Sequence, residues 1–223
     1  MSSTGNTVHD VDALLDAFAT ELGTQPTTLR RFGRASLGYQ GASDGARGVQ
    51  WNAWLDTREG AAFLGVNLEG MAYDGWPVAR FIERELDRPR LFVVREQVDD
   101  PSLVQAIWHR DAWQVSLRPE IAEKHIGESP RRLSELEPAS WAATLRQAYD
   151  CLDPARGHRA RARQTVTTVK GERREYPVSP HLQFRQRVTW SPAHGWRLAL
   201  AETRRNLRPI YTWVAEQSAG LRA

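Results

Sequence analysis

Arginine recurs at every second position in two segments of the last third of the chain, 159–169 and 181–190. The polar positions with this spacing are Arg159, Arg161, Arg163, Gln183, Arg185 and Arg187. Because successive side chains of a β-strand point to opposite faces, each set is expected to share one face. If the two strands pair with their apolar sides inward, five arginines lie on one exposed surface. Such a surface suits phosphate binding, because each guanidinium can contact two oxygens at once.

Two other observations fit a nucleic-acid partner. Gln183 is of a type that can read adenine, and a two-stranded ribbon fits the major groove of DNA. Trp54 falls at a polar position of the alternating segment 49–56, where it could stack on a base or meet a protein partner. We therefore expect a nucleic-acid-binding protein, with DNA favoured over RNA. The simpler alternative is a solvated outer sheet face, in a chain whose 30 basic residues include only two lysines.

Three carboxylates could supply catalysis to such a protein. Glu69 follows the apolar segment 61–68, and Glu96 follows the apolar segment 91–94. If both segments are parallel strands joined by a helix, both carboxylates emerge at the edge where open α/β sheets bind ligands. Joined by Asp74 from the intervening turn, Glu69 and Glu96 could hold Mg²⁺ for phosphodiester hydrolysis, as in a nuclease of restriction or defence type. The alternative is that these acidic residues end strands because they are solvated.

Hydrophobic periodicity predicts the elements that must position these residues. The segments typical of helices are 8–22, 78–86, 138–152 and 209–217, and those typical of strands are 49–56, 61–68, 91–94, 113–117, 159–169, 181–190 and 196–200. The remainder of 101–118 fits either the start of a helix or a hairpin. We expect one α+β domain over residues 1–223, with a mixed or antiparallel sheet, helices at both termini and a βαβ unit at 61–95 as one option.

The formal charge of +3 is unevenly divided along the chain. Residues 1–150 carry 16 basic and 22 acidic side chains, a net charge of −6, whereas residues 151–223 carry 14 basic and 5 acidic ones, a net charge of +9. This asymmetry indicates a surface that faces a polyanion. It also fits an interaction or regulatory module whose basic face meets an acidic partner or the acidic part of the same chain. A third option is an enzyme for a small anionic substrate, with the glycine-rich segment 33–48 as its lid.

Composition excludes several other classes of protein. The single Cys151 cannot form an internal disulfide, and the six dispersed histidines lack zinc-binding spacing. No apolar run approaches the ~18 residues needed to cross a bilayer, and the N-terminus lacks the features of a secretion signal. We therefore expect a cytoplasmic protein that makes no membrane contact.

Overall fold

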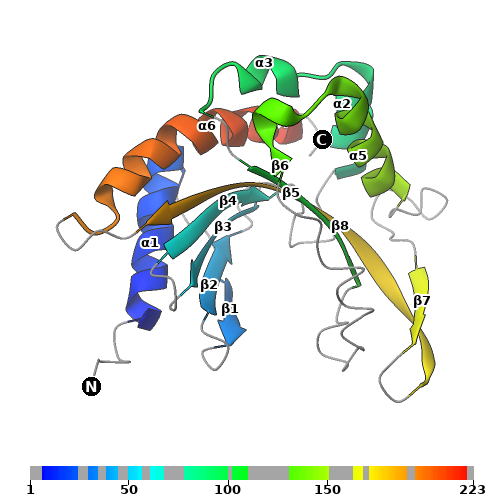
Figure 1. Cartoon of the computed structure of the whole chain (residues 1–223), viewed down its shortest axis with the longest axis horizontal. Coiled ribbons are helices and arrows are strands. Elements are labelled where there is room, and N and C mark those ends of the chain that lie inside the picture. Colours follow the sequence, from blue (N-terminus) through cyan, green and yellow to red (C-terminus); the bar gives the residue numbers. More distant parts are fainter. Residues whose placement is uncertain are drawn as a thin grey trace.

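A curved antiparallel sheet carries the helices on its convex side (Figure 1). The computed structural model describes residues 7–24, 30–34, 39–44, 50–56, 61–67, 78–99, 102–109, 131–150, 163–167, 171–189 and 194–219. They form an α+β fold whose eight-stranded sheet has the order β1-β2-β3-β4-β8-β5-β6, with β7 paired to β8 outside that path. The strands are β1 (Arg30–Arg34), β2 (Tyr39–Asp44), β3 (Gln50–Asp56), β4 (Ala61–Asn67), β5 (Ser102–His109), β6 (Arg131–Arg132), β7 (Arg163–Thr167) and β8 (Arg173–Thr189).

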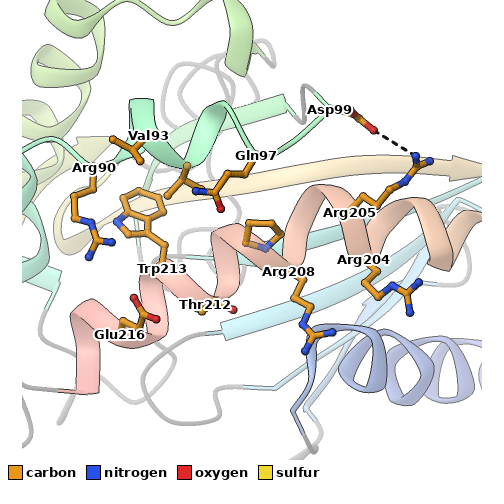
Figure 2. A pocket seen from close by; sticks show the side chains of 12 residues that line it. Arg90, Val93, Gln97, Asp99, Arg204, Arg205, Arg208, Thr212, Trp213 and Glu216 are labelled. Carbon is orange, nitrogen blue, oxygen red and sulfur yellow. Dashed lines mark ion pairs between the residues drawn. The ribbon is translucent and has the colours of Figure 1, made fainter.

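The helices at the two ends of the described chain pack against each other and against the sheet. The helical segments are α1 (Thr7–Leu22), α2 (Val78–Asp87), α3 (Leu91–Arg95), the 3₁₀ turn η4 (Leu133–Glu135), α5 (Pro138–Asp150) and α6 (Arg197–Ala219). α1 contacts α6, β2 and β3, whereas α6 also contacts β4 and β8. The short helix α3 lies beside α6 (Figure 2). None of the described helices is long and apolar enough to cross a membrane.

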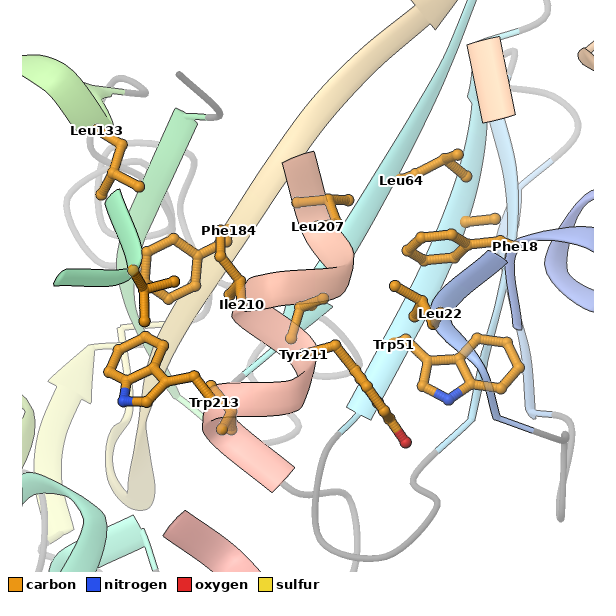
Figure 3. Close-up of a cluster of buried hydrophobic side chains, with 14 of the residues drawn as sticks. Phe18, Leu22, Trp51, Leu64, Leu133, Phe184, Leu207, Ile210, Tyr211 and Trp213 are labelled. Carbon is orange, nitrogen blue, oxygen red and sulfur yellow. The ribbon is translucent and has the colours of Figure 1, made fainter. Parts of the chain in front are cut away.

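Aromatic side chains join the helices to the sheet (Figure 3). Phe18 of α1 meets the ring of Trp51 in β3 edge to face, with 6.1 Å between the ring centroids. Phe184 of β8 has its ring centroid 6.0 Å from that of Trp213 in α6 and 6.4 Å from that of Trp141 in α5. All five side chains are buried, and burial of each large apolar side chain contributes ~1.5–3 kcal/mol. The face that carries Trp51 and Phe184 is therefore the core face of the sheet.

A glycine ends α1 in the left-handed conformation. Gly23 has φ of +76°, a conformation that glycine adopts at little cost because it has no Cβ. The amide of Gly23 donates to the carbonyl of Thr20 at 3.0 Å, and the amide of Thr24 donates to the carbonyl of Ala19 at 2.9 Å. This pair of bonds is the Schellman motif, which satisfies carbonyls that the end of a helix would otherwise leave unpaired.

The segment predicted as a buried strand at 91–94 is instead the helix α3. The carboxylate of Glu85 accepts hydrogen bonds from the amides of Arg90 and Leu91, at the start of α3. Leu91 and Val94, three positions apart, are both buried and lie on the same side of this helical turn. A four-residue apolar run fits a strand or a helix equally well. Here the hydrogen bonds to Glu85 of α2 favour the helix. The predicted βαβ unit at 61–95 is therefore wrong, and every strand pairing described is antiparallel.

Residues 197–200 differ from the prediction, and the segment after 101 resolves an alternative that the sequence left open. Residues 197–200, predicted as part of a strand at 196–200, form the first turn of α6, where the amide of Leu200 donates to the carbonyl of Trp196 at 2.8 Å. The ambiguous segment after 101 contains the strand β5, which pairs with β8 and β6. The strand predicted at 113–117 lies outside the described residues.

Candidate functional site

The side of the sheet opposite the helices carries most of the described residues that the sequence marked for binding. We call this surface the polar sheet face and define it by positions Asn52, Phe63, Gly65, Gln183, Arg185 and Arg187. Strand register places Asn52, Gly65 and Arg185 in one cross-strand row. The next row contains positions 54, 63 and 187, so Trp54 and Arg187 flank Phe63 in register.

The predicted alternation within 181–190 is confirmed at 184 and 187–189, whereas Gln183 is buried on the polar side and Gln186 is half-buried on the core side. Phe184 and Val188 are buried on the core face, whereas Arg187 and Thr189 are exposed. Arg185 is half-buried. The period of two thus separates the cationic side chains from the core, as an ordinary strand requires.

Arg185 stacks on an aromatic ring in the middle of the polar sheet face. Its guanidinium carbon lies 4.6 Å from the centroid of the Phe63 ring, within the range of a cation–π contact. Burial lowers the pKa of Arg185, because desolvation disfavours a charged group. Among the described residues, no carboxylate is paired with this guanidinium. Its N–H donors can therefore serve an added anion.

Gln183 is committed to a neighbour and is only 8% exposed. Its Nε2 donates to Asn52 Oδ1 at 2.5 Å. Gly65 makes room for this pair, since a Cβ there would collide with the Gln183 amide and lie 2.8 Å from Asn52 Oδ1. The prediction that Gln183 reads a base edge is therefore not supported, because its side chain is buried and one of its two amide N–H groups already donates to Asn52.

The predicted pairing of 159–169 with 181–190 is wrong. β7 pairs with the first part of β8, where Arg163 lies opposite Pro177. Pro177 precedes Arg185 by eight positions in one continuous strand, which corresponds to ~26 Å. Residues 183–185 of β8 already have β4 on one side and β5 on the other, and the described pairing of β7 is confined to residues 173–177. The expected surface of five arginines therefore does not form from that pairing, and Arg159 and Arg161 lie outside the described residues.

The expected carboxylate site loses its geometric basis. Glu96 is the C-cap of α3 rather than the end of a strand, and its side chain is 76% exposed, 3.9 Å from Arg95 Nε. Glu69 and Asp74 lie outside the described residues. In the described part of the chain, no three His, Cys, Asp or Glu side chains form a group that could hold a metal ion. Magnesium binding by Glu69 and Glu96 thus stays a prediction, and the parallel strands from which it was inferred are absent from the described residues.

Sequence reasoning missed Phe63. Its strand reads as a continuous apolar run, in which no alternation separates the two faces. Pairing with β3, whose alternation is clear, assigns the faces: Ala62, Leu64 and Val66 belong to the core face and Phe63 to the other. Phe63 could have been identified as an aromatic residue that aligns with polar positions of the neighbouring strands.

Comparison with known proteins gives no assignment: no protein-family model matches the chain, and neither a curated protein nor a solved structure matches it.

Proposed function

We propose that this protein binds single-stranded nucleic acid on the polar sheet face. The observation that carries the proposal is the Arg185–Phe63 stack: a half-buried guanidinium over an aromatic ring, with no carboxylate paired to it among the described residues. Proteins bind single strands by stacking bases on aromatic rings and guanidinium planes while cations contact the phosphates. Arg185, Arg187 and Phe63 are side chains of these two kinds.

The arrangement favours single strands over duplex DNA. Insertion into a major groove requires a projecting helix or two-stranded ribbon, whereas Arg185 lies inside the sheet between β4 and β5, and Arg187 lies beside β4. With Gln183 buried and hydrogen-bonded to Asn52, base-edge reading at this position is weak. We therefore expect binding with little sequence preference.

Fluorescence anisotropy with labelled single-stranded and duplex DNA and RNA tests the proposal. Single strands should bind most tightly at low salt, and two phosphate contacts should give a slope of log K against log salt of about −1.4. Arg185→Ala and Phe63→Leu should each weaken binding roughly tenfold, because a stacking contact is worth ~1–3 kcal/mol. Arg173→Ala is the matched control, since Arg173 is an exposed arginine in the other part of β8.

Three results would contradict the proposal: no binding at low salt, preference for duplex, or equal losses in the Arg173 and Arg185 variants. Repeating the measurements with Mg²⁺ tests the nuclease expectation separately. Cleavage that is lost on Glu96→Gln would support catalysis by Glu69, Asp74 and Glu96. Binding without cleavage would contradict the nuclease expectation.

A further inference from the structure

A second surface, on the helical side of the molecule, combines cations with apolar side chains. A groove of about 670 Å³ runs between α3 and α6 (Figure 2). We call it the arginine groove, because Arg90, Arg204, Arg205 and Arg208 line it together with only two acidic residues, Asp99 and Glu216. It shares no residue with the polar sheet face.

Two of the four arginines in the arginine groove are unpaired among the described residues. Arg90 and Arg208 are exposed, and neither guanidinium has an ion-pair partner there. Arg204 pairs with Glu21 at 3.6 Å, and Arg205 meets Asp99 at 4.0 Å. The contact between Arg205 and Asp99 joins two mostly exposed side chains and is worth little in water, so an incoming carboxylate can replace it. In Figure 2, Arg90 lies toward one end of the groove and Arg205 toward the other, while Arg208 points toward the end of α1.

Apolar groups line the same groove. Val94 and Trp213 are buried against its floor, and Pro209 lies on the α6 side. Val93 is a large apolar side chain that is 61% exposed on the same side. The groove thus offers cations beside an apolar strip.

We propose that the arginine groove binds an acidic segment of a partner protein, with an apolar side chain between its carboxylates. Carboxylates complement the arginines at both ends, and the apolar side chain covers Val93. A phosphate ion or a nucleic-acid backbone would use only the cations. An acidic peptide with an apolar side chain is therefore the ligand class that uses both features.

The test uses the full chain and a fluorescein-labelled decapeptide of glutamates with a central Leu-Phe pair. Two control peptides carry lysine in place of glutamate or glutamate in place of Leu-Phe. We expect the first peptide to bind tightest. The double variant Arg90→Ala/Arg208→Ala should weaken it about tenfold, and the uncharged Val93→Ser about fivefold. Arg173→Ala, on an exposed arginine outside the groove, should leave the affinity unchanged.

The alternatives give different results. No binding at low salt, or binding insensitive to the Arg90/Arg208 double variant, would overturn the proposal. Equal affinity for the all-glutamate peptide, with no effect of Val93→Ser, would reduce the groove to a nonspecific anion patch and also overturn the proposal. Competition by a single-stranded oligonucleotide that the double variant abolishes would instead assign the groove to nucleic acid. The proposal is independent of the sheet-face function, because Arg185→Ala should leave peptide affinity intact.

Discussion

Glu85 is a buried acid that holds three helices together. Its side chain on α2 is only 1% exposed. The carboxylate accepts the amides of Arg90 and Leu91 in the α3 region, and the indole N–H of Trp141 in α5 at 3.4 Å. Burial raises the pKa of Glu85 from its ordinary value of 4.5, and the N–H donors from Arg90, Trp141 and Leu91 offset only part of that effect.

Glu85 should make stability depend on pH with a definite sign. The pKa of Glu85 is higher in the folded chain than in the unfolded chain. At pH values between these two pKa values, the folded chain therefore binds the proton more tightly than the unfolded chain does. The free energy of unfolding should therefore fall as pH rises from 4.5 through the raised pKa. Glu85→Gln removes this contribution, so the stability of the natural chain relative to the variant should decrease over that window.

Urea unfolding at a series of pH values measures this difference. Glu135→Gln, at an exposed acid in η4, should show no comparable trend. A constant difference between the natural chain and Glu85→Gln across the window would mean that the pKa of Glu85 is not raised.

At the scale of elements, helix ends are set by single residues. Gly23 adopts φ of +76°, a conformation that costs an L-residue with a Cβ about 1–2 kcal/mol. An added Cβ would lie 3.4 Å from Arg208 Nη2, which is an ordinary contact with a flexible side chain. The backbone conformation therefore dominates the cost.

Gly23→Ala should lower the free energy of unfolding by about 1 kcal/mol, as measured by urea or thermal denaturation. Asp16→Ala is the matched control, because Asp16 is an exposed residue inside the same helix. Its replacement should change stability little. If both variants unfold alike, the glycine is not required at the end of α1.

Elements with a clear period or clear ends were predictable from the sequence, including the seven-residue strands β3 and β4, whereas the run 91–94 and the non-local strand partners were not. The amphipathic pattern of 8–22 and the Gly23 stop gave α1 almost to the residue. The run 91–94 could not be assigned, because its cap comes from Glu85, a side chain on the preceding helix. The partners of 181–190 could not be predicted either, because β4 and β5 pair with β8 across sequence separations of 69 to 128 positions.

At the scale of the whole molecule, the basic charge of 151–223 is distributed to two sides. The alternating pattern predicted one cationic surface, and Arg185 and Arg187 do share the polar sheet face. Arg204, Arg205 and Arg208 belong to α6 and line the groove on the helical side. Charge counts along the sequence could reveal the excess of arginine but not this division, because strand and helix geometry decide where each arginine lies.

The two surfaces should bind their ligands independently. The sheet and its helical layer separate them by ~10 Å or more, which is at least the Debye length at 0.1 M salt. Saturating the acidic decapeptide should therefore change the affinity for a single-stranded oligonucleotide by less than about twofold at that salt. Anisotropy with the label on the oligonucleotide measures this. Mutual exclusion would mean that the two ligands share one site.

The seventeen residues of β8 impose an order on folding. This strand pairs with β7, β5 and β4, in registers that join Ser102 to Arg185 and Ala61 to Thr189. During synthesis, β1 to β4 can form a local meander, but β4 keeps an unpaired edge until Thr189 has left the ribosome. Closing such distant pairs is slow, and an exposed edge strand can recruit other chains. Aggregation of nascent chains is therefore the hazard that this topology creates, and protection of the β4 edge is what a chaperone would have to provide.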